Sequence, residues 1–198
     1  MPRPSSRVAR LATLIGIPAA LVASGVVVGH ASYSAYSATT DSPTSNWRSG
    51  TVNLSDDDSQ TALFSASNLK PGSTDSHCVA VTSTGSLPSA VKLYGSNYST
   101  TNNLASSINV KIEEGAGGSF ASCTGFVAQS SGGTLFNDTL ANFSAKTNYA
   151  TGLGDWAPTG SASETKVFKF TYTVDPAAPN TTQGGTAAIG FTWEDQNS

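Results

Sequence analysis

Charged side chains, histidine and cysteine are all scarce in this chain of 198 residues. Asp, Glu, Lys and Arg make up only 12% of the sequence, which has two histidines and two cysteines. It contains neither the His-Glu-x-x-His motif of zinc peptidases nor the Gly-x-Ser-x-Gly turn of serine hydrolases. We therefore expect no catalytic residue, no metal ion and no cofactor, and we expect Ser, Thr, Asn and Gly to supply most of the solubility.

The first part of the chain has the layout of an export signal. Three arginines within the first ten residues are followed by an uncharged apolar run at 11–28, and small residues follow at Ala31 and Ala35. The run approaches the roughly 18 residues of a membrane anchor, but Pro and Gly interrupt it and no basic cluster follows. We predict a signal peptide at 1–35 and one secreted domain at 36–198, so that only the uncleaved signal meets the membrane.

The net charge of the predicted mature chain limits the classes of partner that it can bind. All thirteen acidic residues follow residue 35, but only seven of the ten basic residues do, which gives a net charge of about −6. This sign argues against nucleic acid or an anionic membrane surface as a partner. The remaining length is enough for a single domain with a real core.

Short runs of alternating apolar and polar residues recur along the mature chain, each bounded by Gly, Pro, Asn or Ser. The alternation is typical of strands in a sheet with one wet face. One short helix is expected within 135–146, where Asn137-Asp138 can cap it. Together these features predict an all-β protein, an antiparallel, jelly-roll-like β-sandwich. The expected strands are 47–54, 61–65, 77–82, 90–94, 108–113, 166–174 and 187–193.

The residues that most resemble metal ligands have two interpretations each. The three aspartates at 56–58 suit calcium, but calcium needs roughly six to eight oxygen ligands and no EF-hand spacing follows, so we predict a solvated turn. His77 is the one histidine after residue 35, and zinc there would need a carboxylate such as that of Asp75. A surface histidine is the favoured interpretation.

Three further features are interpreted as structural. The Gly-rich stretch at 115–119 lacks the Lys-Ser/Thr of a phosphate-binding loop, so we predict a turn. Glu113 and Glu114 are adjacent on a strand and point to opposite faces, which excludes them as a glycosidase pair. Trp156 either pins its loop onto the sandwich or binds a sugar or a partner, and pinning is favoured.

Five stretches, taken in order, carry a resemblance to a known family. They are Ala-Ser-Tyr-Ser-Ala-Tyr-Ser at 31–37, Trp-Arg-Ser-Gly-Thr-Val-Asn-Leu at 47–54, Leu-Lys-Pro-Gly at 69–72, Val-Ala-Val-Thr-Ser-Thr-Gly-Ser-Leu at 79–87 and Gly-Phe-Thr-Trp-Glu at 190–194. This pattern resembles the camelysin/TasA-like proteins. These are exported bacterial proteins that a dedicated SipW-type signal peptidase usually processes.

The resemblance implies a fold, a cleavage site and a mode of assembly. Members of the family have a jelly-roll-like sandwich, and the best understood build extracellular fibres of the biofilm matrix. By this resemblance the signal is cut between Ala35 and Tyr36, although a cut after Ala31 also fits the residues. Fibre-forming members donate an N-terminal strand to the next molecule, which implies a donor segment at 36–49 with Tyr36 and Trp47 in it.

The sequence therefore favours an exported structural protein of the cell surface or biofilm matrix. Its partners are expected to be copies of itself or other matrix proteins. A secreted metallopeptidase is the first alternative, because the family name carries that label, and no catalytic position can be carried over. An adhesion or glycan-binding module that uses Trp156 or the Gly-rich stretch is the second.

The two cysteines are expected to pair. An exported chain meets an oxidising compartment, in which cysteines form disulfides. Cys78 lies out of phase with Val79 and Val81 and so faces away from their side of the strand. We predict a disulfide between Cys78 and Cys123, with two free buried thiols as the alternative.

Overall fold

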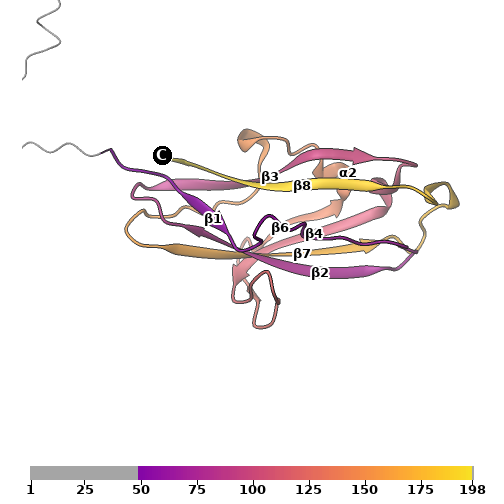
Figure 1. The fold of residues 1–198 in the computed structure, drawn as a ribbon, viewed down its shortest axis with the longest axis horizontal. Coiled ribbons are helices and arrows are strands. Elements are labelled where there is room, and N and C mark those ends of the chain that lie inside the picture. Colours follow the sequence, from indigo (N-terminus) through magenta and orange to yellow (C-terminus); the bar gives the residue numbers. More distant parts are fainter. Residues whose placement is uncertain (1–48, 198) are drawn as a thin grey trace, which may run out of the picture. The chain divides into compact units, whose positions relative to one another are not determined.

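The computed structural model describes residues 49–197, and its regular structure is almost entirely antiparallel β (Figure 1). The strands are β1 (Leu54–Asp56), β2 (Thr74–Ser83), β3 (Ser89–Thr100), β4 (Ile108–Ala116), β5 (Val127–Ala128), β6 (Thr134–Thr139), β7 (Glu164–Val174) and β8 (Ala187–Asn197). The short helices are η1 (Leu104–Ser107), α2 (Leu140–Phe143), η2 (Tyr149–Thr151) and η3 (Asn180–Thr182).

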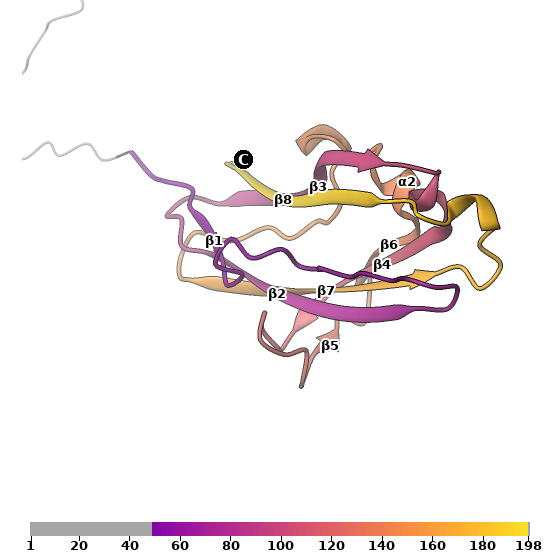
Figure 2. The same cartoon turned by 45° about the vertical axis from the view of Figure 1, so that its right-hand side comes forward.

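The strands of this part of the chain form two sheets that face each other. The larger sheet has the order β1-β2-β7-β4-β5, with β6 also paired to β4, and the smaller sheet consists of β3 and β8. All of these pairings are antiparallel. The two sheets appear as separate layers in both views (Figures 1 and 2). The prediction of an all-β protein is confirmed.

The core between the sheets comes from the alternating apolar residues that the sequence displays. Phe168 and Phe170 of β7 are 2% and 0% exposed, as alternation predicts. Across the gap, the ring of Phe191 on β8 lies 4.5 Å from that of Phe170, and Trp193 lies 5.4 Å from Phe168. Full burial of one such side chain contributes about 1.5–3 kcal/mol, so these contacts hold the two layers together.

The predicted strand at 61–65 is wrong. Residues 57–73 form no strand, although Leu63 and Phe64 are partly buried against the core. Left-handed backbone at Ser59 and Asn68 turns the chain on either side of this stretch, and a strand cannot run through such turns. The expected strand at 47–54 is likewise reduced, within the described residues, to Leu54, where β1 begins.

The short helix expected within 135–146 is confirmed as α2, but it is confined to Leu140–Phe143. Six of the residues around this position form β6, which pairs with β4, and α2 that follows has only four residues. Its cap is Thr139, whose hydroxyl accepts the N–H of Asn142 at 3.2 Å, and not Asn137-Asp138. The free edge of β4 supplies backbone partners for residues 134–139, so the helix begins only after them.

Candidate functional site

Within residues 49–197, the smaller sheet has a free edge, which belongs to β8. The opposite edge of this sheet, formed by β3, has backbone partners. Val91 donates its N–H to the Trp156 carbonyl, and Leu93 exchanges two hydrogen bonds with Leu153. No backbone hydrogen bond joins the second edge of β8 to any other residue within 49–197. Such an edge is a row of unpaired N–H and C=O groups that accepts another strand.

The register shows which residues of β8 carry these unpaired groups. Since Val91 and Leu93 face away from β8, their neighbour Lys92 is the residue of β3 that bonds to β8, and it pairs with Glu194. Backbone groups alternate between the two sides of an antiparallel strand. Trp193 and Asp195, which flank Glu194, therefore direct their N–H and C=O groups to the open edge.

A cleft lies beside this edge, between β8 and the chain that runs from β1 to β2. The segment after β1 passes between β8 and β2 in both views (Figures 1 and 2). A groove of about 640 Å³ lies between this segment and β8, and a smaller one of about 210 Å³ lies between β1 and β8. Phe191 and Trp193 line both, so we call the two together the β8 cleft.

The walls of the β8 cleft are mainly apolar. The larger groove is lined by side chains from the segment after β1, from the core face of the larger sheet and from β8. These include Leu63, Phe64, Leu69, Val79, Val110, Leu140, Tyr172 and Ile189. An apolar wall next to unpaired backbone suits an extended peptide with alternating side chains. It offers little to a small charged substrate.

An acidic residue, Asp56, lines the β1 end of the cleft, and unpartnered polar groups lie on β8 at Trp193 and beyond it. Burial, and then the neighbouring Asp58 carboxyl, raise the pKa of Asp56. The indole Nε1 of Trp193 and both carboxylate oxygens of Asp195 are buried and have no hydrogen-bond partner within the described residues. Buried polar groups in proteins nearly always have a hydrogen-bond partner. The lack of a partner for these atoms therefore needs an explanation.

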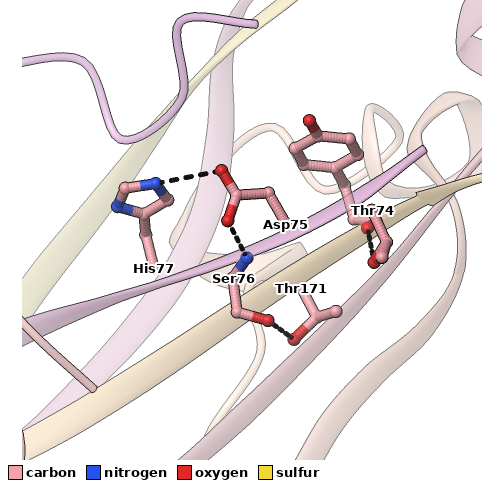
Figure 3. Close-up of polar contacts among 6 residues, drawn as sticks. Thr74, Asp75, Ser76, His77 and Thr171 are labelled. Carbon is pink, nitrogen blue, oxygen red and sulfur yellow. Dashed lines mark hydrogen bonds and ion pairs between the residues drawn. The ribbon is translucent and has the colours of Figure 1, made fainter. Parts of the chain in front are cut away.

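His77 and Asp75 lie on β2, and their side chains point toward each other (Figure 3). The His77 Nε2 is 3.4 Å from a carboxylate oxygen of Asp75, and Phe64 packs edge-on against both His77 and Tyr172. Burial and then the Asp75 charge raise the pKa of Tyr172. In residues 49–197 no three His, Cys, Asp or Glu side chains are placed to bind a metal ion. His77 is thus a partly exposed strand residue whose ring lies beside the Asp75 carboxylate.

The predicted disulfide is confirmed. Cys78 lies on the outer face of the larger sheet, 1% exposed, and is bonded to Cys123. Cys123 belongs to the loop between β4 and β5, and the Gly-rich stretch at 115–119 leads into that loop. Gly117 and Gly118 have positive φ and make the predicted turn, while Gly115 is still part of β4. The disulfide ties this loop to β2.

The interpretation of the three aspartates as a solvated turn is wrong for Asp56 and incomplete for Asp57, which is exposed in a bend. Asp56 belongs to β1. Asp57 bridges two distant parts of the chain, because its carboxylate accepts the N–H of Ala80 at 2.8 Å and that of Phe120 at 2.7 Å. Asp58 accepts only the nearby Gln60 N–H among the bonds described. No local pattern reveals partners 23 and 63 residues away.

Glu114 is the residue that sequence reasoning missed. As predicted, Glu113 and Glu114 face opposite sides: Glu113 pairs with Lys111 at 2.6 Å, but Glu114 is 0% exposed in the core. Neither of its carboxylate oxygens has a hydrogen-bond partner among the described residues. Burial raises the pKa of Glu114; the charge of Lys166 lowers it and that of Asp155 raises it. The sequence carries one signal of this burial, because Glu114 falls on the apolar face of the alternating strand.

Trp156 is pinned, as the loop interpretation predicts. It is 7% exposed, and its carbonyl accepts the N–H of Val91. A glycan-binding role for its ring is therefore not supported. The predicted cleavage site at Ala35 and Tyr36, and the predicted donor residue Trp47, lie outside the described residues.

No protein-family model and no curated protein matches this sequence. No helix within the described residues is long and apolar enough to cross a membrane. The function is therefore inferred from the chemistry of the β8 cleft.

Proposed function

We propose that this chain is an exported structural protein of the cell surface or biofilm matrix that assembles into fibres. Its mature part, residues 36–198, would be a jelly-roll-like domain that accepts an N-terminal strand of a neighbouring copy. The free edge of β8 above an apolar cleft carries this proposal. Unpaired backbone gives affinity for an added strand, and apolar pockets accept its alternate side chains.

The length of the N-terminal segment matches the acceptor. Thirteen residues, 36–48, lie between the predicted cleavage site and the described domain, and β8 has eleven residues. Thr51 is held to Ser86 by two hydrogen bonds: its carbonyl accepts the Ser86 N–H at 2.7 Å, and its own N–H donates to the Ser86 hydroxyl at 3.0 Å. The segment before it would extend from this anchored point to the next copy, with Tyr36 and Trp47 as its aromatic side chains.

The contact would be between different surfaces of the two copies. A donor segment on one molecule and the β8 cleft on the next form a heterologous interface, which gives an open filament when its rotation does not close a ring. Each added copy leaves its own cleft free for another.

Export is supported by independent features. The signal layout at 1–35 is one, and the disulfide between Cys78 and Cys123 is another. Disulfides persist in oxidising compartments and are rare in the cytosol. The low content of charged residues and the wealth of Ser and Thr do not distinguish compartments.

The test compares protein 36–198 with a form that lacks residues 36–48. We expect filaments by electron microscopy and growing particles by light scattering for the intact form, and monomers for the truncated form. Equal filament formation by both forms would overturn strand donation by this segment. Casein hydrolysis that a chelator abolishes would instead support the metallopeptidase alternative.

A further inference from the structure

We propose that Asp195 selects the occupant of the β8 cleft by binding the Arg48 side chain of the inserted segment from a second copy. This inference rests on the proposed function, since it needs a strand in the cleft. It adds the residue pair that would set the direction and the identity of that strand.

The position of Asp195 supports the proposal. It follows Trp193 by two residues, so the two side chains leave β8 on the same face, and Trp193 packs against Phe168 across the core. Both carboxylate oxygens of Asp195 and the indole Nε1 of Trp193 are buried without a partner in residues 49–197. A buried carboxylate without a partner is costly, and removing that cost favours binding of a cation.

The backbone of Asp195 faces the free edge of β8. Trp193 and Asp195 are the residues whose N–H and C=O groups point to the free edge of β8. A strand added there brings backbone carbonyls close to β8, and one of them would accept the Trp193 indole N–H. Asp195 needs donors instead, and only a cationic side chain also balances its charge.

Arg48 is the basic residue that the N-terminal segment offers. It is the one Lys or Arg between Arg10 and Lys70. Its planar guanidinium donates two parallel hydrogen bonds to a carboxylate, which an amide or a hydroxyl cannot do. Asp56 and Asp58, which line the cleft walls, add to the negative surroundings.

The pair fixes the direction of the inserted segment. Arg48 is the second-last residue of the donor segment 36–49, and Asp195 lies near the end of β8. When the two meet, the segment runs parallel to β8. The opposite direction would bring the new α-amino group of Tyr36 to Asp195, and the experiment distinguishes these two cations.

The acceptor for the test is the chain from residue 49 to 198. Every residue of the hydrophobic core, from Leu54 to Trp193, lies within it, as does the disulfide, so it has what it needs to fold. The probe is a fluorescent peptide of residues 36–49, and binding is measured by anisotropy. Acceptor variants are Asp195→Asn and, as a matched control, Glu194→Gln. The Glu194 carboxylate accepts the Tyr94 hydroxyl at 2.9 Å and leaves β8 on the other face.

We expect Asp195→Asn to weaken peptide binding by roughly tenfold or more, because a buried charge loses its partner. Glu194→Gln should leave binding unchanged. A peptide with Arg48→Gln should bind weakly and equally to the wild-type and Asp195→Asn acceptors, as expected when the two residues contact each other. Acetylation of the peptide's α-amino group should have no effect on binding.

Three outcomes would overturn the proposal. Equal binding of the wild-type peptide to both acceptors removes the role of Asp195 and leaves strand addition standing. Sensitivity to acetylation, but not to Arg48→Gln, assigns the cation to the N-terminus. If the peptide binds no acceptor at all, strand addition itself is wrong. Urea unfolding of Asp195→Asn checks its fold, and we expect no loss of stability because no described bond is removed.

Discussion

The Asp57 carboxylate accepts the backbone N–H of Phe120 at 2.7 Å, although 63 residues separate the two along the chain. Its other oxygen accepts the N–H of Ala80, so one side chain joins the end of β1, the edge of β2 and the loop after β4. The disulfide of Cys78 ties the same loop to the same strand. The loop is thus held over the outer face of the larger sheet at two points.

Loss of the Asp57 side chain should lower stability. Asp57→Ala leaves two backbone donors without their partner, and we expect a decrease of about 1–2 kcal/mol in the free energy of unfolding, since the site is exposed to water. Asp58→Ala is the matched control, because Asp58 bonds only within its own turn, and it should cost less. Urea unfolding of both variants measures this, and equal losses would contradict the bridging role.

Removal of the disulfide should have a larger effect. The bond between Cys78 and Cys123 closes a loop of 45 residues, and the chain-entropy account gives about 4 kcal/mol for a loop of this size. We expect the variant with both cysteines changed to serine to lose roughly this amount in urea unfolding. The reduced wild-type protein is the comparison and should behave alike. A loss below about 1 kcal/mol would show that the loop stays constrained without the bond.

The stability of the domain should fall as the pH rises, because of Glu114. Burial raises the pKa of this carboxyl in the folded chain above its ordinary value of 4.5. Between these two pKa values the folded state binds more protons than the unfolded state, so stability is full below pH 4.5 and decreases as the pH rises through the folded pKa. Unfolding in urea from pH 4 to pH 8 measures this decrease.

A variant isolates the contribution of Glu114. Glu114→Gln keeps the shape of the side chain but cannot ionise, so it should remove the decrease in this pH range. Glu113→Gln, on the solvent side of the same strand, is the control and should retain it. If both variants keep the wild-type pH dependence, another group is responsible.

Strand alternation predicted the all-β class and much of the core. The runs around Ile112 and Phe170 became β4 and β7 because a period of two places every second side chain on one face, whatever the partner strand is. The facing of Cys78 followed from the same rule, whereas the disulfide was predicted from two cysteines in a chain with an export-signal layout. Trp156 was correctly assigned to a pinned loop because a large indole gains most from burial.

The tertiary structure alone decided where the alternation stops and which edges stay free. Thr134–Thr139 is a strand because β4 lies beside it, and Asp57 is a bridge because Ala80 and Phe120 come to it. The edge of β8 is free because β3 pairs with one side of β8 and no strand within 49–197 pairs with the other. Local sequence determines which face of a strand is apolar, because that depends on neighbours along the chain. Pairing depends on partners far along the chain, and it is pairing that creates the β8 cleft.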